Sequence, residues 1–310
     1  MLHSLEIDKV TKVFGDNVAV DKISANIPTG SIYGFLGPNG AGKTTTIRMI
    51  MSILYPDAGS IKLFGSLTPE QCKDRLGYLP EEKGLYKKMK TIELITYFGR
   101  LKGIPGSLAR SKALQLLQQF GLGSCADLRC DALSKGMGQK VQIIATLLHE
   151  PELVILDEPF SGLDPINVEV VRDIILDLKR AGKTVIFSTH VMEQAEQICD
   201  YILLINNGKK ILDGSLAEVK KCGHQTISLE YEGSGEVLRN LPGVTRVNDM
   251  GKAAELSLQP DADPQSILTR IVPELTLRSF TVNDPSLHEI FVRSVGDIDE
   301  TVPQDHGPES

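Results

Sequence analysis

The first third of the chain opens with two stretches in which apolar and polar residues alternate. These stretches cover residues 5–13 and 18–27, and Gly15-Asp16-Asn17 separates them. Alternation with a period of two is typical of strands that bury one face, and a short turn between two such runs predicts a hairpin. We therefore expect an antiparallel β layer at the start of the chain.

From residue 31 onward the pattern switches between short apolar runs and helical periodicity. An apolar run over 31–36 leads into a glycine-rich loop, and 44–54 has helical spacing, as does the more polar segment 85–148. Further strands are expected at 154–156, 185–188, 201–205 and 210–212, and further helices at 168–180 and 191–199. Strands that alternate with helices indicate an α/β architecture around a largely parallel sheet.

The composition changes near residues 220–223, and a second pattern follows. It predicts strands at 226–231, 244–248, 253–258 and 276–281, and helices at 235–241, 263–272 and 285–295. This βαββαβ order resembles a small α+β module of the ferredoxin-like type. We therefore predict a domain over 1–220 with a helical subdomain at about 85–148, an accessory domain over 224–295, and an acidic, disordered tail over 296–310.

Composition limits the class of protein. The chain has 310 residues, of which 41% are hydrophobic and 24% charged, as in ordinary globular proteins. No apolar run approaches the ~18 residues of a membrane-spanning helix, and the first residues lack the apolar core of a signal peptide, so a cytoplasmic location is expected. A net charge of −7 argues against a nucleic-acid partner, and five scattered cysteines are expected to be reduced thiols.

The glycine-rich loop carries the clearest chemistry. It fits the pattern G-x-x-x-x-G-K-[ST] between a predicted strand and a predicted helix, the context that a phosphate-binding loop requires. Glycines let backbone N–H groups turn toward an oxyanion, Lys43 can reach the outer phosphates, and Thr44 offers a hydroxyl to Mg²⁺. An accidental glycine-rich turn is the alternative. The candidate nucleotide-binding residues are Gly37, Pro38, Asn39, Gly40, Ala41, Gly42, Lys43, Thr44 and Thr45.

Two acids follow the apolar strand expected at 154–156. Asp157 and Glu158 would lie at the carboxyl edge of the sheet, where ligands collect in open α/β folds. Asp157 could hold Mg²⁺ together with Thr44, and Glu158 could polarise an attacking water. The alternative is that both acids only cap the turn at Pro159.

The order of motifs along the chain resembles the ATP-binding cassette (ABC) family. After the phosphate loop come Leu133-Ser134-Lys135-Gly136-Met137, Asp157-Glu158, Ser161-Gly162-Leu163-Asp164 and His190. The resemblance covers residues 2–220 and, with the C-terminal pattern, is similar to the ATPase subunits of multidrug- or sodium-extrusion-type exporters. It implies a phosphate-loop NTPase fold of the ABC type, with an antiparallel β subdomain and a helical subdomain.

The resemblance assigns roles to five further residues. Phe14 stands where the family stacks an aromatic ring on adenine, although a core aromatic is the local alternative. Ser134 and Gly136 stand in the signature segment, which contacts the γ-phosphate held by the opposite cassette. Asp164 stands in the loop that communicates across that interface. His190 stands where the family's histidine touches the γ-phosphate, and a structural histidine is the alternative.

The chain departs from the family pattern at two places. Lys135 and Met137 replace the commonest Gly and Gln of the signature. Glu81 stands where a Gln that senses Mg²⁺ and faces the membrane partner is common. An acid there could bind magnesium or pair with the membrane partner, and the alternative is that Glu81 and Glu82 form a solvated acidic face.

Together these features predict an ATPase that uses ATP and Mg²⁺, with Lys43, Glu158 and His190 as catalytic residues. Because the chain has one phosphate loop, the resemblance implies a dimer with a second cassette, either a copy or a close homologue. It also implies a separate transmembrane permease that holds the chain at the inner face of the cell membrane, with export as the expected direction. The alternatives are a soluble cassette ATPase without a transport role, a non-hydrolysing regulatory cassette, and an unrelated phosphate-loop kinase.

Overall fold

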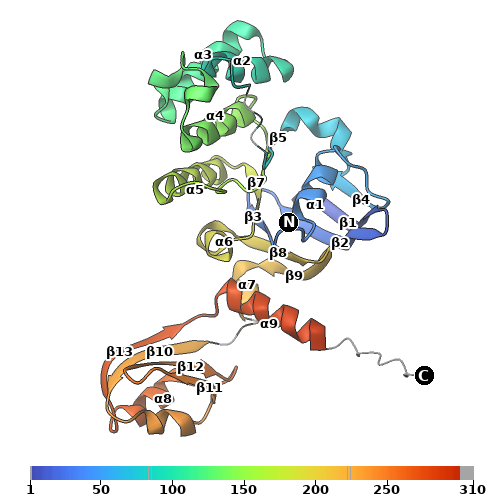
Figure 1. Ribbon diagram of the computed structural model, residues 1–310. Helices are drawn as coiled ribbons and strands as arrows, with labels where there is room; N and C mark the ends of the chain where they lie inside the picture. Colours follow the sequence, from blue (N-terminus) through green and yellow to red (C-terminus); the bar gives the residue numbers. More distant parts are fainter. Residues whose placement is uncertain (1, 83, 85, 222, 224, 301–310) are drawn as a thin grey trace, which may run out of the picture. The chain divides into compact units, whose positions relative to one another are not determined.

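The chain forms two compact units, Met1–Ser215 and Leu216–Ser310 (Figure 1). The computed structural model describes residues 2–300 except 83, 85, 222 and 224. The division falls five residues before the change in composition near residue 220, because helix α7 (Leu216–Lys221) belongs to the second unit. Leu85 and Cys222, which the sequence predictions include, lie outside the described residues.

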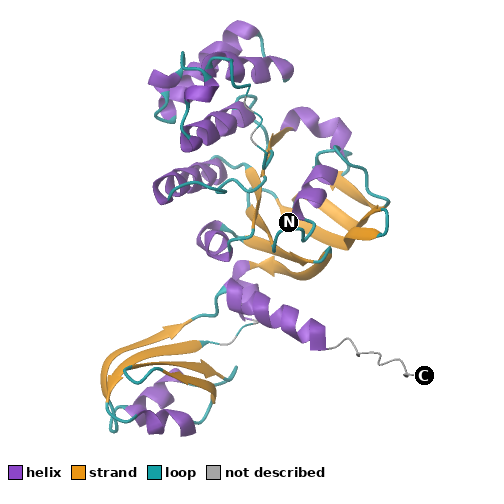
Figure 2. Ribbon diagram, in the orientation of Figure 1, coloured by secondary structure: helices purple, strands orange, loops and turns teal. Residues whose placement is uncertain are grey.

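A six-stranded sheet forms the centre of the first unit (Figure 2). Its order is β5-β6-β7-β3-β8-β9, and every pair is parallel except β8 with β9. The strands are β3 (Ile32–Leu36), β5 (Leu76–Leu79), β6 (Leu153–Leu156), β7 (Thr184–Thr189), β8 (Tyr201–Asn206) and β9 (Lys209–Ser215). All residues of β3, β6 and β7 are buried, which explains their continuous apolar runs. The prediction of a largely parallel sheet is confirmed.

Three helices flank this sheet in the chain order that the sequence predicts. They are α1 (Lys43–Ile50), α5 (Pro165–Arg180) and α6 (Met192–Ile198). Helix α1 begins directly after the phosphate loop that follows β3. Helix α5 begins with Asp164 as its N-cap and Pro165 in its first turn, a favourable start for a helix.

The predicted hairpin forms, and it has a third strand that the sequence pattern did not show. Strands β1 (His3–Phe14) and β2 (Asn17–Pro28) pair antiparallel, and β4 (Ala58–Leu63) joins the other edge of β1. Only the last residues of β4 alternate clearly between buried and exposed, so its hydrophobic pattern is too short to predict a strand. The 3-10 helix η1 (Pro69–Arg75) and strand β5 were likewise not predicted.

The segment predicted to be helical contains three α-helices and two short 3-10 turns. The helices are α2 (Thr91–Leu101), α3 (Gly106–Gln119) and α4 (Lys135–Leu147), and the turns are η2 (Gly123–Cys125) and η3 (Cys130–Ala132). They enclose a separate apolar cluster that includes Ile95, Leu117 and Ile144. No helix among the described residues is long and apolar enough to cross a membrane.

The second unit contains a four-stranded antiparallel sheet in the order β11-β12-β10-β13. Its strands are β10 (Thr226–Glu232), β11 (Val244–Asp249), β12 (Ala253–Leu258) and β13 (Thr276–Asn283). Leu238 of the 3-10 helix η4 (Gly235–Asn240) and Ile267 of α8 (Pro264–Ile271) pack on one face of this sheet. The four predicted strands are present, and the ferredoxin-like description stays a prediction.

Two details of the second unit differ from the sequence analysis. The predicted helix over 235–241 is a 3-10 helix. Glycine is a poor helix former, and Leu238 is the one fully buried side chain of this segment. Helix α9 (Leu287–Glu300) continues through residues 296–300, which the sequence analysis placed in a disordered tail. Residues 301–310 lie outside the described part of the chain.

The central sheet should dominate the stability of the first unit. Ile186 lies in β7, is fully buried and belongs to its main apolar cluster, so Ile186→Ala should lower the free energy of unfolding by about 2–5 kcal/mol. Ile166→Ala is the matched control, because that side chain is 77% exposed and its loss should change stability by less than about 0.5 kcal/mol. Urea unfolding followed by circular dichroism measures both. Equal midpoints for the two variants would contradict this description of the core.

Candidate nucleotide-binding site

The phosphate loop joins the carboxyl end of β3 to the first turn of α1, as the motif requires. Two of its glycines have no room for a side chain. A Cβ on Gly37 would lie 2.0 Å from the Ile205 carbonyl oxygen, and one on Gly42 would lie 2.5 Å from that of Ala19. Both also have positive φ angles, +147° and +105°, which glycine adopts without strain. The close approach of strands β2 and β8 therefore explains why glycine stands at these positions.

A cavity of about 640 Å³ lies above the loop and is within the size range of ligand pockets. Nearly every loop residue predicted to bind nucleotide lines it, including Lys43, Thr44 and Thr45. Gly37 and Pro38 do not line it, and they contact the lysine from below instead. The lining residues are Asn17, Val18, Ala19, Asn39, Gly40, Ala41, Gly42, Lys43, Thr44, Thr45, Glu81, Glu158, Asn207 and Gly208.

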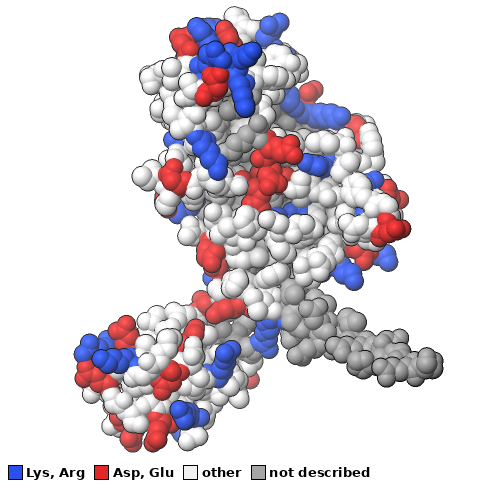
Figure 3. Space-filling model, in the orientation of Figure 1, with Lys and Arg blue, Asp and Glu red and all other residues white. Residues whose placement is uncertain are grey.

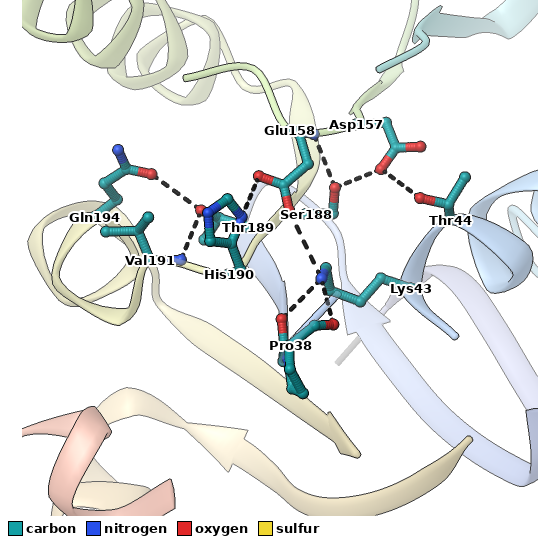
Figure 4. A network of polar contacts seen from close by, with 11 residues as sticks. Pro38, Lys43, Thr44, Asp157, Glu158, Ser188, Thr189, His190, Val191 and Gln194 are labelled. Atoms are coloured by element: carbon teal, nitrogen blue, oxygen red, sulfur yellow. Dashed lines mark hydrogen bonds and ion pairs between the residues drawn. The ribbon is translucent and has the colours of Figure 1, made fainter. Parts of the chain in front are cut away.

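Lys43 lines this cavity, and its side chain is buried beside Glu158 (Figure 4). Its Nζ donates hydrogen bonds to the carbonyl oxygens of Gly37 at 2.7 Å and Pro38 at 3.0 Å. It also lies 3.6 Å from Oε1 of Glu158. Burial lowers the pKa of Lys43, and the nearby carboxylate of Glu158 opposes that effect. The lysine is thus held in place by carbonyls and one acid.

Asp157 follows β6 and is held by two hydroxyl groups. Thr44 Oγ1 donates to Asp157 Oδ1 at 3.2 Å, and Ser188 Oγ donates to the same atom at 2.5 Å. Burial raises the pKa of Asp157, while these hydrogen bonds act in the opposite direction. The second oxygen, Oδ2, is buried and has no hydrogen-bond partner among the described residues. A buried carboxylate oxygen without a partner is the kind of group that a cation stabilises.

Glu158 is the neighbouring acid, and its carboxylate contacts both Lys43 and His190. Its backbone has φ +47°, an uncommon conformation for a residue with a side chain, and its N–H donates to Ser188 Oγ at 2.9 Å. Its Oε2 lies 3.0 Å from Nδ1 of His190, and its Oε1 is buried without a hydrogen-bond partner in the described part of the chain. The carboxylate is therefore placed between Lys43 and His190 (Figure 4).

The turn after β7 positions His190. Thr189 Oγ1 accepts a hydrogen bond from the Val191 N–H at 3.1 Å and donates to Gln194 Oε1 at 3.0 Å. These bonds tie the turn to helix α6, and the imidazole is about half exposed beside Glu158. The structure brings together Glu158 and His190, which lie far apart in the chain, and their catalytic roles stay a prediction.

Glu81 follows β5 and lines the same cavity. Its charge attracts the Lys43 ammonium and acts to raise the pKa of that lysine, although burial is the larger effect. Within the described ranges, no group of three or more His, Cys, Asp or Glu side chains is arranged to hold a metal ion. Glu81 therefore does not form a three-carboxylate site with Asp157 and Glu158 in this structure, and its role as a metal ligand stays a prediction.

The residues of the signature segment and of the Asp164 loop do not line the cavity above the phosphate loop. Ser134 caps helix α4 by accepting a hydrogen bond from the Met137 N–H at 3.3 Å, and Asp164 caps α5 by accepting one from the Asn167 N–H at 3.0 Å. Gly136 lies against the Asn167 side chain, since a Cβ there would be 2.5 Å from it. None of Ser134, Gly136 and Asp164 lines the cavity above the phosphate loop. The structure thus joins the two motifs to each other and separates both from Lys43.

Lys135, one of the two departures from the family pattern, contacts the loop that carries Asp164. A Cβ on Gly162 would lie 1.6 Å from Lys135 Nζ, so the lysine covers this glycine, which has φ +63°. The ammonium is therefore near the surface shared by the signature segment and the Asp164 loop.

Phe14 ends β1 and is 47% exposed, so it is not the core aromatic that the local pattern allowed. Lys12 Nζ lies 5.5 Å from its ring centroid. The nearby cavity wall comes from Asn17, Val18 and Ala19 instead. Adenine stacking by Phe14 stays a prediction.

Sequence analysis missed several residues of the site. Ser188 contacts both acids, and the only signal was its place at the end of the strand before His190. Asn207 and Gly208 line the cavity because their hairpin turn lies against the loop, where the Gly208 N–H donates to the Ala41 carbonyl at 3.0 Å. Such contacts depend on the order of strands in the sheet, which no local pattern reveals.

Comparison with known proteins gives two family matches. Residues 20–161 match the family described as ABC transporter, and residues 214–295 match the C-terminal domain of DrrA1-3-like ATP-binding proteins. The chain is 38% identical over 297 residues to the uncharacterized ABC transporter ATP-binding protein YhaQ of Bacillus subtilis, covering 96% of this chain and all of that protein. It is 34% identical to the daunorubicin/doxorubicin resistance ATP-binding protein DrrA of Streptomyces peucetius, covering 95% and 93% of the two chains.

Solved structures agree with these relatives. One described as the ATP-binding subunit of an ABC transporter superposes with a TM-score of 0.64 at 28% identity, over 72% of this chain and 93% of that chain. The predicted fold of the ABC type is therefore confirmed for the first unit. The phosphate loop, the acids after β6 and the sequence relatives lead to one conclusion: this chain belongs to the ABC transporter family, as an ATP-binding subunit that hydrolyses ATP to power transport.

Proposed function

We propose that the chain binds ATP with Mg²⁺ above its phosphate loop, pairs with a second cassette, and drives export through a separate membrane permease. The observation that carries this proposal is the cluster of Lys43, Asp157, Glu158 and His190 at one end of the parallel sheet. In this arrangement a cation for the phosphates, a site for the metal and a base for water lie close together, and Lys43, Thr44 and Glu158 line one cavity.

The donor set fits magnesium. Mg²⁺ prefers oxygen ligands and is usually held by one or two protein groups plus substrate phosphates. The Thr44 hydroxyl and Asp157 are hydrogen-bonded to each other, and Asp157 Oδ2 has no other described partner. These two residues would hold the ion, which would offset negative charge on the phosphates.

Three side chains, those of Lys43, Glu158 and His190, have separate roles in binding and hydrolysis. Lys43 binds the outer phosphates, and its buried ammonium gains negative partners when ATP enters. Glu158 orients the attacking water and accepts its proton. His190 lies against Glu158 Oε2, so its imidazole fixes that carboxylate and can reach the γ-phosphate from the open side.

The second cassette follows from the position of the signature segment. Gly136 lies against the Asn167 side chain, which donates to Asp164, and neither Ser134 nor Gly136 lines the cavity of its own chain. Backbone N–H groups at the start of α4 are suited to bind a phosphate, so they can complete a site only on another molecule. A homodimer or a pair with a close homologue would supply two such shared sites.

Export and the membrane location are inferred from relatives. The names of DrrA and of the linearmycin resistance ATP-binding protein LnrL of Bacillus subtilis describe resistance to toxic compounds, which export can provide. The permease would hold the chain at the inner face of the membrane. Acidic and basic side chains are intermixed on the face drawn in Figure 3, and we expect no nucleic-acid partner.

The first test of this proposal removes the base. Glu158→Gln keeps the size of the side chain and should lower ATP turnover by about 10²–10⁴-fold while ATP binding survives, because proton acceptance is lost. Trapped ATP should then hold two chains together, which size-exclusion chromatography with and without ATP detects. Glu193→Gln makes the same change at an exposed position on α6 and should leave turnover unchanged. Near-normal hydrolysis by Glu158→Gln would remove Glu158 from its role.

The shared site is tested in the same background. Ser134→Arg added to Glu158→Gln places a bulky side chain at the exposed start of α4, which does not line the cavity above the phosphate loop of its own chain. ATP should still bind, but the dimer should no longer form. A dimer that persists in this double variant would show that the signature segment does not complete the site of a partner.

Glu81 has a test of its own. Glu81→Gln removes one negative charge from the cavity, so the Mg²⁺ concentration for half-maximal hydrolysis should shift if the acid acts near the metal, by about tenfold for a well-made charged contact. Glu82→Gln, the exposed neighbour, is the matched control. If only the assembled transporter loses coupled transport, Glu81 pairs with the permease. If neither assay changes, Glu81 belongs to a solvated acidic face.

A further inference from the structure

The second unit contains a cavity whose lining includes no residue of the candidate nucleotide-binding site. It has a volume of about 560 Å³ and lies between the outer face of the four-stranded sheet and helix α9. This volume is within the usual range for pockets that hold small molecules. Its walls are formed by Gly223, Thr226, Arg246, Asn248, Glu255, Ser257, Pro285, Glu289, Ile290, Arg293 and Ser294.

The strand register places the polar lining residues side by side. Ser257 of β12 pairs with Thr226 of β10 on one side and with Arg246 of β11 on the other, so these three form one row across the sheet. Glu255 and Asn248 pair in the next row on the same face. Residues between them along the strands, such as Leu256, point to the opposite face and pack in the apolar core.

Helix α9 supplies the other wall, and its first turns are fixed by packing. Glu289 and Arg293 are one helical turn apart and both line the cavity. Ile290, which lies between them, is 4% exposed. A Cβ on Gly223 would lie 2.5 Å from Pro285 and 3.0 Å from Ile290, so the chain that enters the module contacts the start of this helix closely. The cavity is therefore built from ordered elements on both sides.

The charges of the lining are incompletely paired. Across the part of the chain that the structure describes, no carboxylate lies within ion-pair distance of Arg246 or Arg293, whereas Arg278 of the same module pairs with Glu232. One oxygen of Glu289, Oε2, accepts hydrogen bonds from the Ser286 N–H at 2.8 Å and hydroxyl at 3.0 Å. Arg246 and Arg293 are exposed side chains from different elements, and they line the same cavity as Glu255 and Glu289 without an ion pair to either acid.

We propose that this cavity binds a small organic anion, whose carboxylate or phosphate group is held by Arg246 and Arg293. Guanidinium groups suit both kinds of oxyanion because they offer parallel N–H donors. Thr226, Asn248 and Ser257 provide hydroxyl and amide groups for the polar body of the ligand, and Glu255 accepts a hydrogen bond from it. A bound anion joins α9 to the sheet and makes the module a sensor of that ligand, independent of the ATP site.

Hydrogen–deuterium exchange on the full chain tests this site, since it separates the module from the phosphate loop. Citrate and glucose 6-phosphate serve as the carboxylate and phosphate probes, at constant ionic strength set with sodium chloride. Segments 244–258 and 287–294 should exchange more slowly with at least one probe. Protection by citrate alone identifies a carboxylate ligand, and protection by glucose 6-phosphate alone identifies a phosphate ligand.

Three single variants decide whether the arginines hold the probe. Arg246→Gln and Arg293→Gln should each raise the half-saturating probe concentration by about tenfold, the effect of losing one charge-assisted contact. Arg270→Gln is the matched control, because that exposed arginine lies on α8, which packs on the other face of the sheet. The absence of protection with both probes, or equal protection in Arg246→Gln, Arg293→Gln and the wild type, would overturn the proposal.

Discussion

The burial of the Lys43 ammonium beside two acids is the interaction on which the site depends. An ammonium can be buried only where carbonyls and carboxylates replace water, and here the Gly37 and Pro38 carbonyls and Glu158 do so. Parallel strands make this possible, because β3, β6 and β7 all end at the same edge of the sheet. The phosphate loop, the acids and the histidine turn therefore meet in space although they are far apart in the chain.

The groups at this edge of the sheet lower the stability of the folded protein. Asp157 and Glu158 each bury an oxygen without a described hydrogen-bond partner, and Glu158 adopts a positive φ. Unpaired buried polar groups and such backbone angles each cost on the order of 1–3 kcal/mol. The buried strands around them supply the compensating stability. Magnesium bound beside Thr44 would give Asp157 Oδ2 the partner that it lacks, whereas Glu158 already contacts Lys43 and His190.

Much of this site could be predicted because its motif residues are adjacent in the sequence. The loop from Gly37 to Thr44 and the pair Asp157-Glu158 each follow a short apolar strand, so their place at the sheet edge follows from local sequence. Ser188 and Gly208 were missed because their contacts depend on which strands become neighbours. Strand β4 was missed for a related reason, since its pairing with β1 stabilises a segment whose own pattern is weak.

If the site works as described, Lys43 binds the phosphates of ATP from its buried position. Isothermal titration of ATP with Mg²⁺ into Lys43→Ala and into Lys62→Ala, an exposed lysine on β4, tests it most directly. We expect Lys43→Ala to weaken binding by at least about tenfold, because a charge-assisted contact is lost, while Lys62→Ala should bind as the wild type does. An unchanged Kd for a folded Lys43→Ala protein would contradict it.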